Sequence, residues 1–299
     1  MSKIHSWLAG LGLVLGLLSS GQTFASCDLA PTGGTETRNI GDRSYTINVP
    51  AGLGGQVPLL LSLHGAWGSS SVHEASAGWT PFAAQKKFIV AYPQGAASGY
   101  WDLSEGSPEV AYLREVVADI SSRYCIDPGR IYVDGHSRGS VMSQRAACDA
   151  GDLFAAATGY AGPSPAYEGH ACHPSRPIAV GIFGGDLDPI MLSNYDEDSR
   201  DFWLANAGCN TTPHSSVDLY GRQERYTGCS AGMEIWFRVL SAQSHEWPLG
   251  PRGSDLRNRM WTFLMLHRHP GAAAPGASQP GVDCTVYNPL TWVACSAGN

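Results

Sequence analysis

The segment at residues 130–148 constrains the fold of this chain more than any other stretch. A β-prone run at 131–133 is followed by Gly-His-Ser-Arg-Gly at 135–139 and then by residues 141–148, which have the composition of a helix. A G-x-S-x-G turn between a strand and a helix holds its serine on a strained bend, and the glycines let the two elements pack closely. Ser137 is therefore the predicted nucleophile, beside a helix N-terminus whose N–H groups stabilise an oxyanion.

Apolar runs and amphipathic segments alternate along the rest of the chain. Predicted strands cover residues 44–49, 57–63, 88–92, 131–133, 177–183 and 233–240, with a weaker extended piece at 217–220. Predicted helices cover residues 79–87, 109–124, 141–148, 202–207 and 256–267, and a polar segment at 31–38 precedes the first predicted strand. The alternation predicts an α/β fold, a mostly parallel sheet covered by helices on both faces.

The two ends differ in composition from the middle. Residues 1–25 have the layout of a secretory signal peptide, and their apolar part is too short for a membrane span. Residues 24–27, Phe-Ala-Ser-Cys, also resemble a lipoprotein cleavage box, with Phe where Leu is usual. We expect a catalytic domain at 26–269, secreted to the medium or to the periplasm. A Pro/Gly/Ala linker at 270–281 then precedes a tail at 282–299, either a disulfide-closed end or a surface-binding appendage.

Charge and cysteine content limit the partners. The net charge is −7 and the only lysines are Lys3, Lys86 and Lys87, so the chain has no basic stripe for nucleic acid. Eight cysteines in an exported chain indicate disulfides, and the absence of any C-x-x-C pair argues against a metal site. The cysteines are Cys27, Cys125, Cys148, Cys172, Cys209, Cys229, Cys284 and Cys295.

A serine nucleophile needs a base within hydrogen-bond reach and an acid that orients the base. Asp186 and Asp188 follow the strand at 177–183, and His245 follows the strand at 233–240. The chain order Ser, Asp, His is that of α/β-hydrolases. We expect Asp188 to be the acid, with Asp186 as the alternative. Among the other histidines, we interpret His136 as packing and His267 and His269 as solvated.

Several motifs together resemble one family. They are residues 130–139, Leu-His-Gly-Ala-Trp-Gly-Ser at 63–69, Tyr-Pro-Gln-Gly at 92–95, and the Gly-Cys pairs at 208–209 and 228–229. With them the chain resembles the secreted esterases that group type C and D feruloyl esterases with polyhydroxybutyrate depolymerase-like proteins, similar to carbohydrate esterase family 1. The resemblance covers about residues 27–265 and implies an α/β-hydrolase fold.

The resemblance also carries residue roles. The acid of such esterases lies in a His-Gly-Thr-x-Asp segment, which falls on residues 184–188 and supports Asp188. It implies the disulfides Cys27–Cys125, Cys148–Cys172 and Cys209–Cys229, which leaves Cys284 and Cys295 for a fourth. Gly184 in place of His, Ser140 in place of Gly, and Ala-Gln-Ser at 242–244 in place of glycines depart from the pattern.

The sequence thus predicts a serine carboxylester hydrolase that uses no metal or organic cofactor. Arg138 and Ala66 are the expected oxyanion donors through their backbone N–H groups, with Trp67 as an alternative for the second. By resemblance the substrate is a hydroxycinnamate ester of plant cell-wall polysaccharide. The expected stacking residues are Trp67, Tyr100, Trp101 and Trp247. A polyester such as polyhydroxybutyrate, acetylated xylan, and an inactive carbohydrate-binding role are the alternatives.

Overall fold

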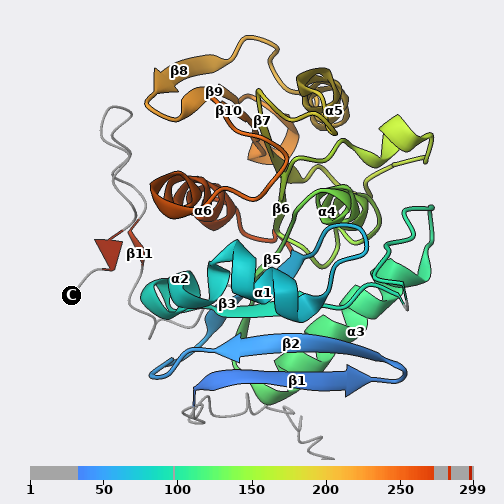
Figure 1. Cartoon of the computed structure of the whole chain (residues 1–299), viewed down its shortest axis with the longest axis vertical. Coiled ribbons are helices and arrows are strands. Elements are labelled where there is room, and N and C mark those ends of the chain that lie inside the picture. Colours follow the sequence, from blue (N-terminus) through green and yellow to red (C-terminus); the bar gives the residue numbers. More distant parts are fainter. Residues whose placement is uncertain (1–32, 97, 273–281, 284–295, 298–299) are drawn as a thin grey trace, which may run out of the picture.

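The centre of the fold is a ten-stranded sheet in the order β1-β2-β4-β3-β5-β6-β7-β10-β9-β8 (Figure 1). The computed structural model describes residues 33–96, 98–272, 282–283 and 296–297. The strands from β4 to β10 run parallel, whereas β1, β2, β9 and β8 pair antiparallel at the two edges. The sheet strands are β1 (Gly34–Ile40), β2 (Arg43–Val49), β3 (Val57–Leu63), β4 (Ile89–Pro93), β5 (Ile126–Gly135), β6 (Ala156–Tyr160), β7 (Ala179–Gly185), β8 (His214–Asp218), β9 (Gly221–Tyr226) and β10 (Ile235–Leu240).

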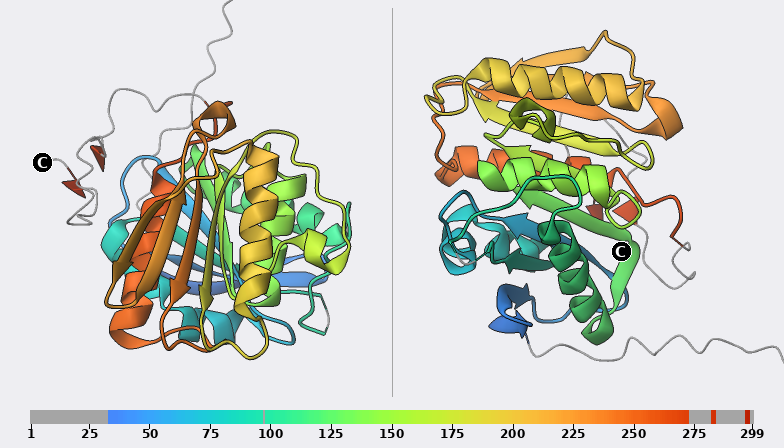
Figure 2. Two further views of the ribbon diagram at one scale, coloured as in Figure 1. Left: turned by 90° about the horizontal axis from the view of Figure 1, so that it is seen from above. Right: turned by 90° about the vertical axis from the view of Figure 1, so that its right-hand side faces the viewer.

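Helices cover both faces of the sheet, as the views in Figure 2 show. The helices are α1 (Ser70–Ala77), α2 (Trp79–Lys86), α3 (Pro108–Arg123), α4 (Arg138–Asp149), α5 (Ser193–Ala207) and α6 (Gly250–Met265), with short turns η1 (Pro165–Glu168) and η2 (Ser230–Gly232). Helices α3, α4 and α5 share one apolar core, and α1, α2 and α6 share the other. The α/β-hydrolase fold class is therefore confirmed.

Strand β3 shows why the sheet is buried on both sides. Leu59, Leu61 and Leu63 belong to the core under α3 and α4, whereas Leu60 belongs to the core under α2 and α6. Side chains alternate along a strand, so an unbroken apolar run supplies both cores. None of the helices in the described part of the chain is long and apolar enough to cross a membrane.

Strands β3, β5, β7 and β10 end at the same edge of the sheet, because they run parallel. The segments that follow them hold the predicted site residues. Ligands of open α/β sheets bind at this carboxyl edge.

Two of the expected disulfides lie among the described residues. Cys148 at the end of α4 is bonded to Cys172, and Cys209 after α5 is bonded to Cys229. Cys125 is also disulfide-bonded. Its expected partner Cys27 lies outside the described residues, as do the predicted signal peptide at 1–25, Cys284 and Cys295, and most of the predicted linker and tail. The short strands β11 (Val282–Asp283) and β12 (Ser296–Ala297) pair with each other.

Five elements differ from the sequence prediction. The segment expected as a polar lead-in at 31–38 overlaps β1 (Gly34–Ile40), which pairs with β2 along its whole length. Helix α1 and strands β6 and β9 were not predicted. Helix α5 begins at 193 rather than 202, because only its last turns carry the large apolar residues that the pattern detects.

Candidate active site

The turn between β5 and α4 holds Ser137 in a strained conformation. Its backbone has φ 55° and ψ −123°, a region that side-chain-bearing residues rarely occupy. A Cβ on Gly135 would overlap the carbonyl of Gly139, and a Cβ on Gly139 would overlap the carbonyl of Leu63. Both positions therefore require glycine, and the G-x-S-x-G pattern follows from this close packing.

Ser137, His245 and Asp188 form a hydrogen-bonded series. His245 Nε2 lies 2.9 Å from Ser137 Oγ, and His245 Nδ1 lies 2.8 Å from Asp188 Oδ2. The carboxylate only accepts, so Nδ1 carries the proton and Nε2 is free to accept from the serine hydroxyl. The Asp188 side chain is fully buried and that of His245 is 12% exposed. This arrangement has the geometry for proton transfer from Ser137 to His245.

The loop between β7 and α5, called here the acid loop, carries two aspartates, Asp186 and Asp188, whose surroundings differ. Asp188 Oδ1 accepts from the backbone N–H of Ile190 and of Met191, at 2.8 Å each, which fixes the carboxylate plane. Asp186 is exposed, and its Oδ1 lies 3.4 Å from the backbone N of Gln243. The structure thus brings Asp188, and not Asp186, to His245.

The loop after β3 lies against Ser137. A Cβ on Gly65 would come within 3.4 Å of the Ser137 Cβ. The Gly65 carbonyl accepts from His64 Nδ1 at 2.7 Å and from Gly68 N at 3.1 Å. Because the peptide unit is planar, the N–H of Ala66 points to the opposite side from this carbonyl. Arg138 opens α4, so its N–H has no acceptor within the helix. The oxyanion role of these two N–H groups stays a prediction.

Known proteins resemble this chain in sequence and in fold. No family model matches it. It is 26% identical over 238 residues to feruloyl esterase B of Piromyces equi, covering 71% of this chain and 44% of that protein. It is 32% identical over 134 residues to poly(3-hydroxyalkanoate) depolymerase C of Paucimonas lemoignei, covering 42% of this chain and 32% of that protein. The acetyl xylan esterase from Aspergillus awamori has the same fold, with a TM-score of 0.65 at 17% identity, covering 77% of this chain and all of that one.

The chain is therefore similar in sequence to feruloyl esterases, acetylxylan esterases and polyhydroxyalkanoate depolymerases. It spans less than half the length of the two curated relatives named above.

Two aromatic side chains, those of Trp67 and Tyr100, lie next to each other near the Arg138 side chain. The Trp67 side chain is 79% exposed, and its ring centroid lies 5.9 Å from that of Tyr100. The guanidinium carbon of Arg138, the residue after Ser137, stands 3.8 Å from the centre of the Tyr100 ring. Arg138 also donates to the carbonyl of Trp101 and to Glu168, so the aromatic pair is tied to the start of α4.

The expectation that Trp101 and Trp247 offer stacking faces is wrong. Trp101 is fully buried, and its Nε1 donates to the carbonyl of His64 at 2.8 Å. Trp247 is 7% exposed and packs edge-on against His136 and Tyr160. Trp101 therefore supports the loop after β3, and Trp247 packs in the core against His136 and Tyr160.

Two histidines also depart from their predicted settings. His136 does more than pack, because its Nε2 lies 2.8 Å from the backbone carbonyl of His245. His267 is buried rather than solvated, and burial lowers its pKa to about 4. His269 is half-buried, with Nε2 3.2 Å from the carbonyl of Gly151. For His136 and His269 the contact comes from a segment distant in the chain, which local sequence patterns do not reveal.

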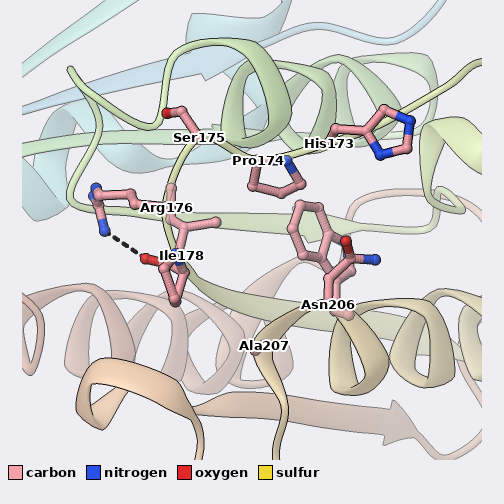
Figure 3. Close-up of a pocket in the computed structure, with 9 residues that line it drawn as sticks. His173, Pro174, Ser175, Arg176, Ile178, Asn206 and Ala207 are labelled. Carbon is pink, nitrogen blue, oxygen red and sulfur yellow. Dashed lines mark hydrogen bonds between the residues drawn. The ribbon is translucent and has the colours of Figure 1, made fainter.

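A cavity of about 320 Å³ lies away from these residues, between the 173–178 segment and the end of α5 (Figure 3). His173, Ile178 and Asn206 line it, together with Arg176. The Arg176 guanidinium donates to three backbone carbonyls, those of Gly151, Pro177 and Phe154, and so is already engaged. This cavity is separate from the Ser137 site.

Proposed function

We propose that the chain is an exported serine carboxylester hydrolase. The observation that carries the proposal is the series Ser137–His245–Asp188, with the serine on a strained turn at the carboxyl edge of the sheet. Similarity to known proteins supports it, because the relatives include a feruloyl esterase and a poly(3-hydroxyalkanoate) depolymerase. The disulfides Cys148–Cys172 and Cys209–Cys229 support export, since such bonds persist in oxidising compartments.

In the proposed reaction Ser137 Oγ attacks the ester carbonyl while His245 Nε2 takes its proton. The backbone N–H groups of Arg138 and Ala66 stabilise the negative charge on the carbonyl oxygen. His245 then returns the proton to the leaving alcohol, and an acyl ester on Ser137 remains. Water, deprotonated by His245, hydrolyses this ester. Asp188 keeps the imidazole in the tautomer that accepts at Nε2.

The proposed acyl group is a hydroxycinnamate such as ferulate, carried on plant cell-wall polysaccharide. The exposed ring of Trp67 and the neighbouring ring of Tyr100 support this assignment. Planar aromatic groups stack on such rings, and the gain is about 1 kcal/mol beyond the buried area. The Arg138 guanidinium lies over the Tyr100 ring, which ties this ring to the residue that follows Ser137.

A polyester substrate is the second candidate, and exposed apolar residues favour it. Leu187, Ile190 and Leu192 in the acid loop are 64%, 59% and 48% exposed, and Leu249 in the segment after His245 is 74% exposed. All four follow strands that end at the edge holding Ser137. Apolar side chains around an ester site suit an aliphatic polymer surface. Acetylated xylan stays a third candidate.

The deciding experiment compares kcat/KM on methyl ferulate, p-nitrophenyl butyrate and a hydroxybutyrate oligomer. Trp67→Ala and Tyr100→Ala test the aromatic pair, and Leu187→Ser with Ile190→Ser tests the apolar loop. The proposal expects the aromatic variants to lose about tenfold on ferulate and little on butyrate. If Leu187→Ser and Ile190→Ser lower kcat/KM only on the hydroxybutyrate oligomer, the proposed substrate becomes a polyester instead of a ferulate ester. Leu219→Ser is the control, because Leu219 is 83% exposed in the β8–β9 turn.

A further inference from the structure

The loop that carries His245, called here the base loop, has little regular structure of its own. Strand β10 ends at Leu240, and α6 begins only at Gly250. Ala242 within this loop has a positive φ of 51°. Even so, His245 Nε2 stays 2.9 Å from Ser137 Oγ. Contacts from outside the loop therefore have to hold it.

On one side the acid loop supplies these contacts. Leu187 N donates to the carbonyl of Gln243 at 3.0 Å. On the other side two consecutive carbonyls of the base loop accept from two side chains. His136 Nε2 lies 2.8 Å from the carbonyl oxygen of His245, and Tyr160 Oη donates to the carbonyl of Ser244 at 2.6 Å.

His136 and Tyr160 form a single rigid unit. Their rings stack with centroids 5.8 Å apart and planes 21° apart, and Trp247 packs edge-on against both. Their backbones are also anchored, because His136 N donates to the carbonyl of Leu63 and Ser137 N donates to the carbonyl of Tyr160. The base loop is thus held by two side chains. His136 directly precedes Ser137, and Tyr160 ends strand β6, whose carbonyl at Tyr160 accepts a hydrogen bond from Ser137 N.

Both side chains keep these bonds across the neutral range. A carbonyl only accepts, so the neutral His136 ring carries its proton on Nε2. Burial lowers the pKa of His136, which keeps the imidazole neutral beside His245. Burial also raises the pKa of Tyr160, which keeps its hydroxyl protonated.

We propose that His136 and Tyr160 are positioning residues: the stacked pair clamps the carbonyls of Ser244 and His245 and so sets the distance from His245 to Ser137. The inference rests on the proposed function, in which His245 is the base. Displacement of a catalytic group by about 1 Å costs about a hundredfold in rate. The clamp therefore affects kcat rather than substrate binding.

The kinetic test uses Tyr160→Phe, which keeps the ring and removes one donor, and His136→Leu, which removes the other. His136→Gln keeps an amide donor near the position of Nε2. Tyr132→Phe is the matched control, because Tyr132 Oη also donates to a backbone carbonyl, that of His267 at 2.9 Å. We expect kcat to fall about tenfold in Tyr160→Phe and about a hundredfold in His136→Leu, with KM within about twofold, and to recover partly in His136→Gln.

A second readout does not depend on turnover. The proton on His245 Nδ1, hydrogen-bonded to Asp188, gives a far-downfield NMR resonance that Asp188→Asn identifies by its loss. The clamp predicts that this resonance shifts or broadens in Tyr160→Phe and His136→Leu and stays in place in Tyr132→Phe. An unchanged resonance with unchanged kcat in folded variants would overturn the clamp. If the wild type shows no Ser137-dependent turnover, the proposed function fails, and the resonance alone decides whether the pair positions His245.

Discussion

The carboxyl group of Asp196 occupies the space that a side chain on Gly184 would need: a Cβ on Gly184 would overlap Asp196 Oδ2. Asp196 lies in the first turn of α5 and is 1% exposed, and Gly184 lies in β7, four residues before Asp188. The glycine at 184, a departure from the pattern that the family resemblance implies, is thus matched by an acidic residue from the covering helix. Asp196 Oδ1 is buried and no described residue donates to it.

A side chain at position 184 should destabilise the fold unless Asp196 is shortened. Gly184→Ala forces the carboxyl of Asp196 to move, and we expect a loss of about 1–3 kcal/mol in the free energy of unfolding. Asp196→Ala in the same chain should remove most of that loss. Urea unfolding of the two single variants and the double variant measures the coupling. Additive effects would contradict the packing described for this pair.

Asp196 should make the fold less stable at high pH. Burial and the nearby Asp188 and Glu197 raise the pKa of Asp196 well above its usual range. The folded chain therefore keeps a proton that the unfolded chain loses above about pH 4, and the free energy of unfolding falls as pH rises from there toward the folded pKa. Asp196→Asn should flatten this fall when urea unfolding is compared at about pH 5 and about pH 8. Asp198→Asn, an exposed change in the same helix, is the control. Equal pH dependence in Asp196→Asn and wild type would refute the assignment.

His267 should weaken the fold in acid. Burial lowers its pKa from 6.5 to about 4, so below about pH 6.5 the unfolded chain binds a proton that the folded chain excludes. Stability from this group is complete above about pH 6.5 and is lost as pH falls to about 4, by about 3 kcal/mol. His267→Phe, which keeps a ring against Phe263, should reduce the acid sensitivity of the melting temperature. If the melting temperature of His267→Phe falls in acid as much as that of the wild type, the acid sensitivity does not come from His267.

Replacing each of the two aspartates of the acid loop by Asn should have very different effects on kcat. Asp188→Asn removes the acceptor of His245 Nδ1, and we expect kcat to fall about 10⁴-fold with the fold intact. Asp186→Asn changes an exposed side chain and should leave kcat within about threefold. Initial rates on p-nitrophenyl butyrate measure both. The reverse ranking would move the acid to Asp186.

The sequence predicted the parts of the site whose cause is local. The turn around Ser137 depends on glycines at fixed offsets, and Asp188 and His245 directly follow apolar strands, so pattern and order locate all three. The buried strands β3, β4, β7 and β10 were predicted for the same reason, because burial on both faces leaves an unbroken apolar run.

The misses have tertiary causes. Strand β1 is polar because it is largely exposed and pairs only with β2. Strand β6, Ala-Ala-Thr-Gly-Tyr, consists mostly of small residues because it packs closely on α4, where a Cβ on Gly159 would overlap Ser140 Oγ. The burial of Trp101 and the bond from His136 to the base loop likewise depend on segments far apart in the chain.

The most direct test of the account is covalent labelling of the purified, oxidised protein with a fluorophosphonate, followed by intact mass and peptide mapping. We predict one adduct, on Ser137, that is absent from Ser137→Ala and slower to form in His245→Gln, because the imidazole activates the hydroxyl. No adduct on the folded wild type, or an adduct that persists in Ser137→Ala, would contradict the assignment of Ser137 as the nucleophile.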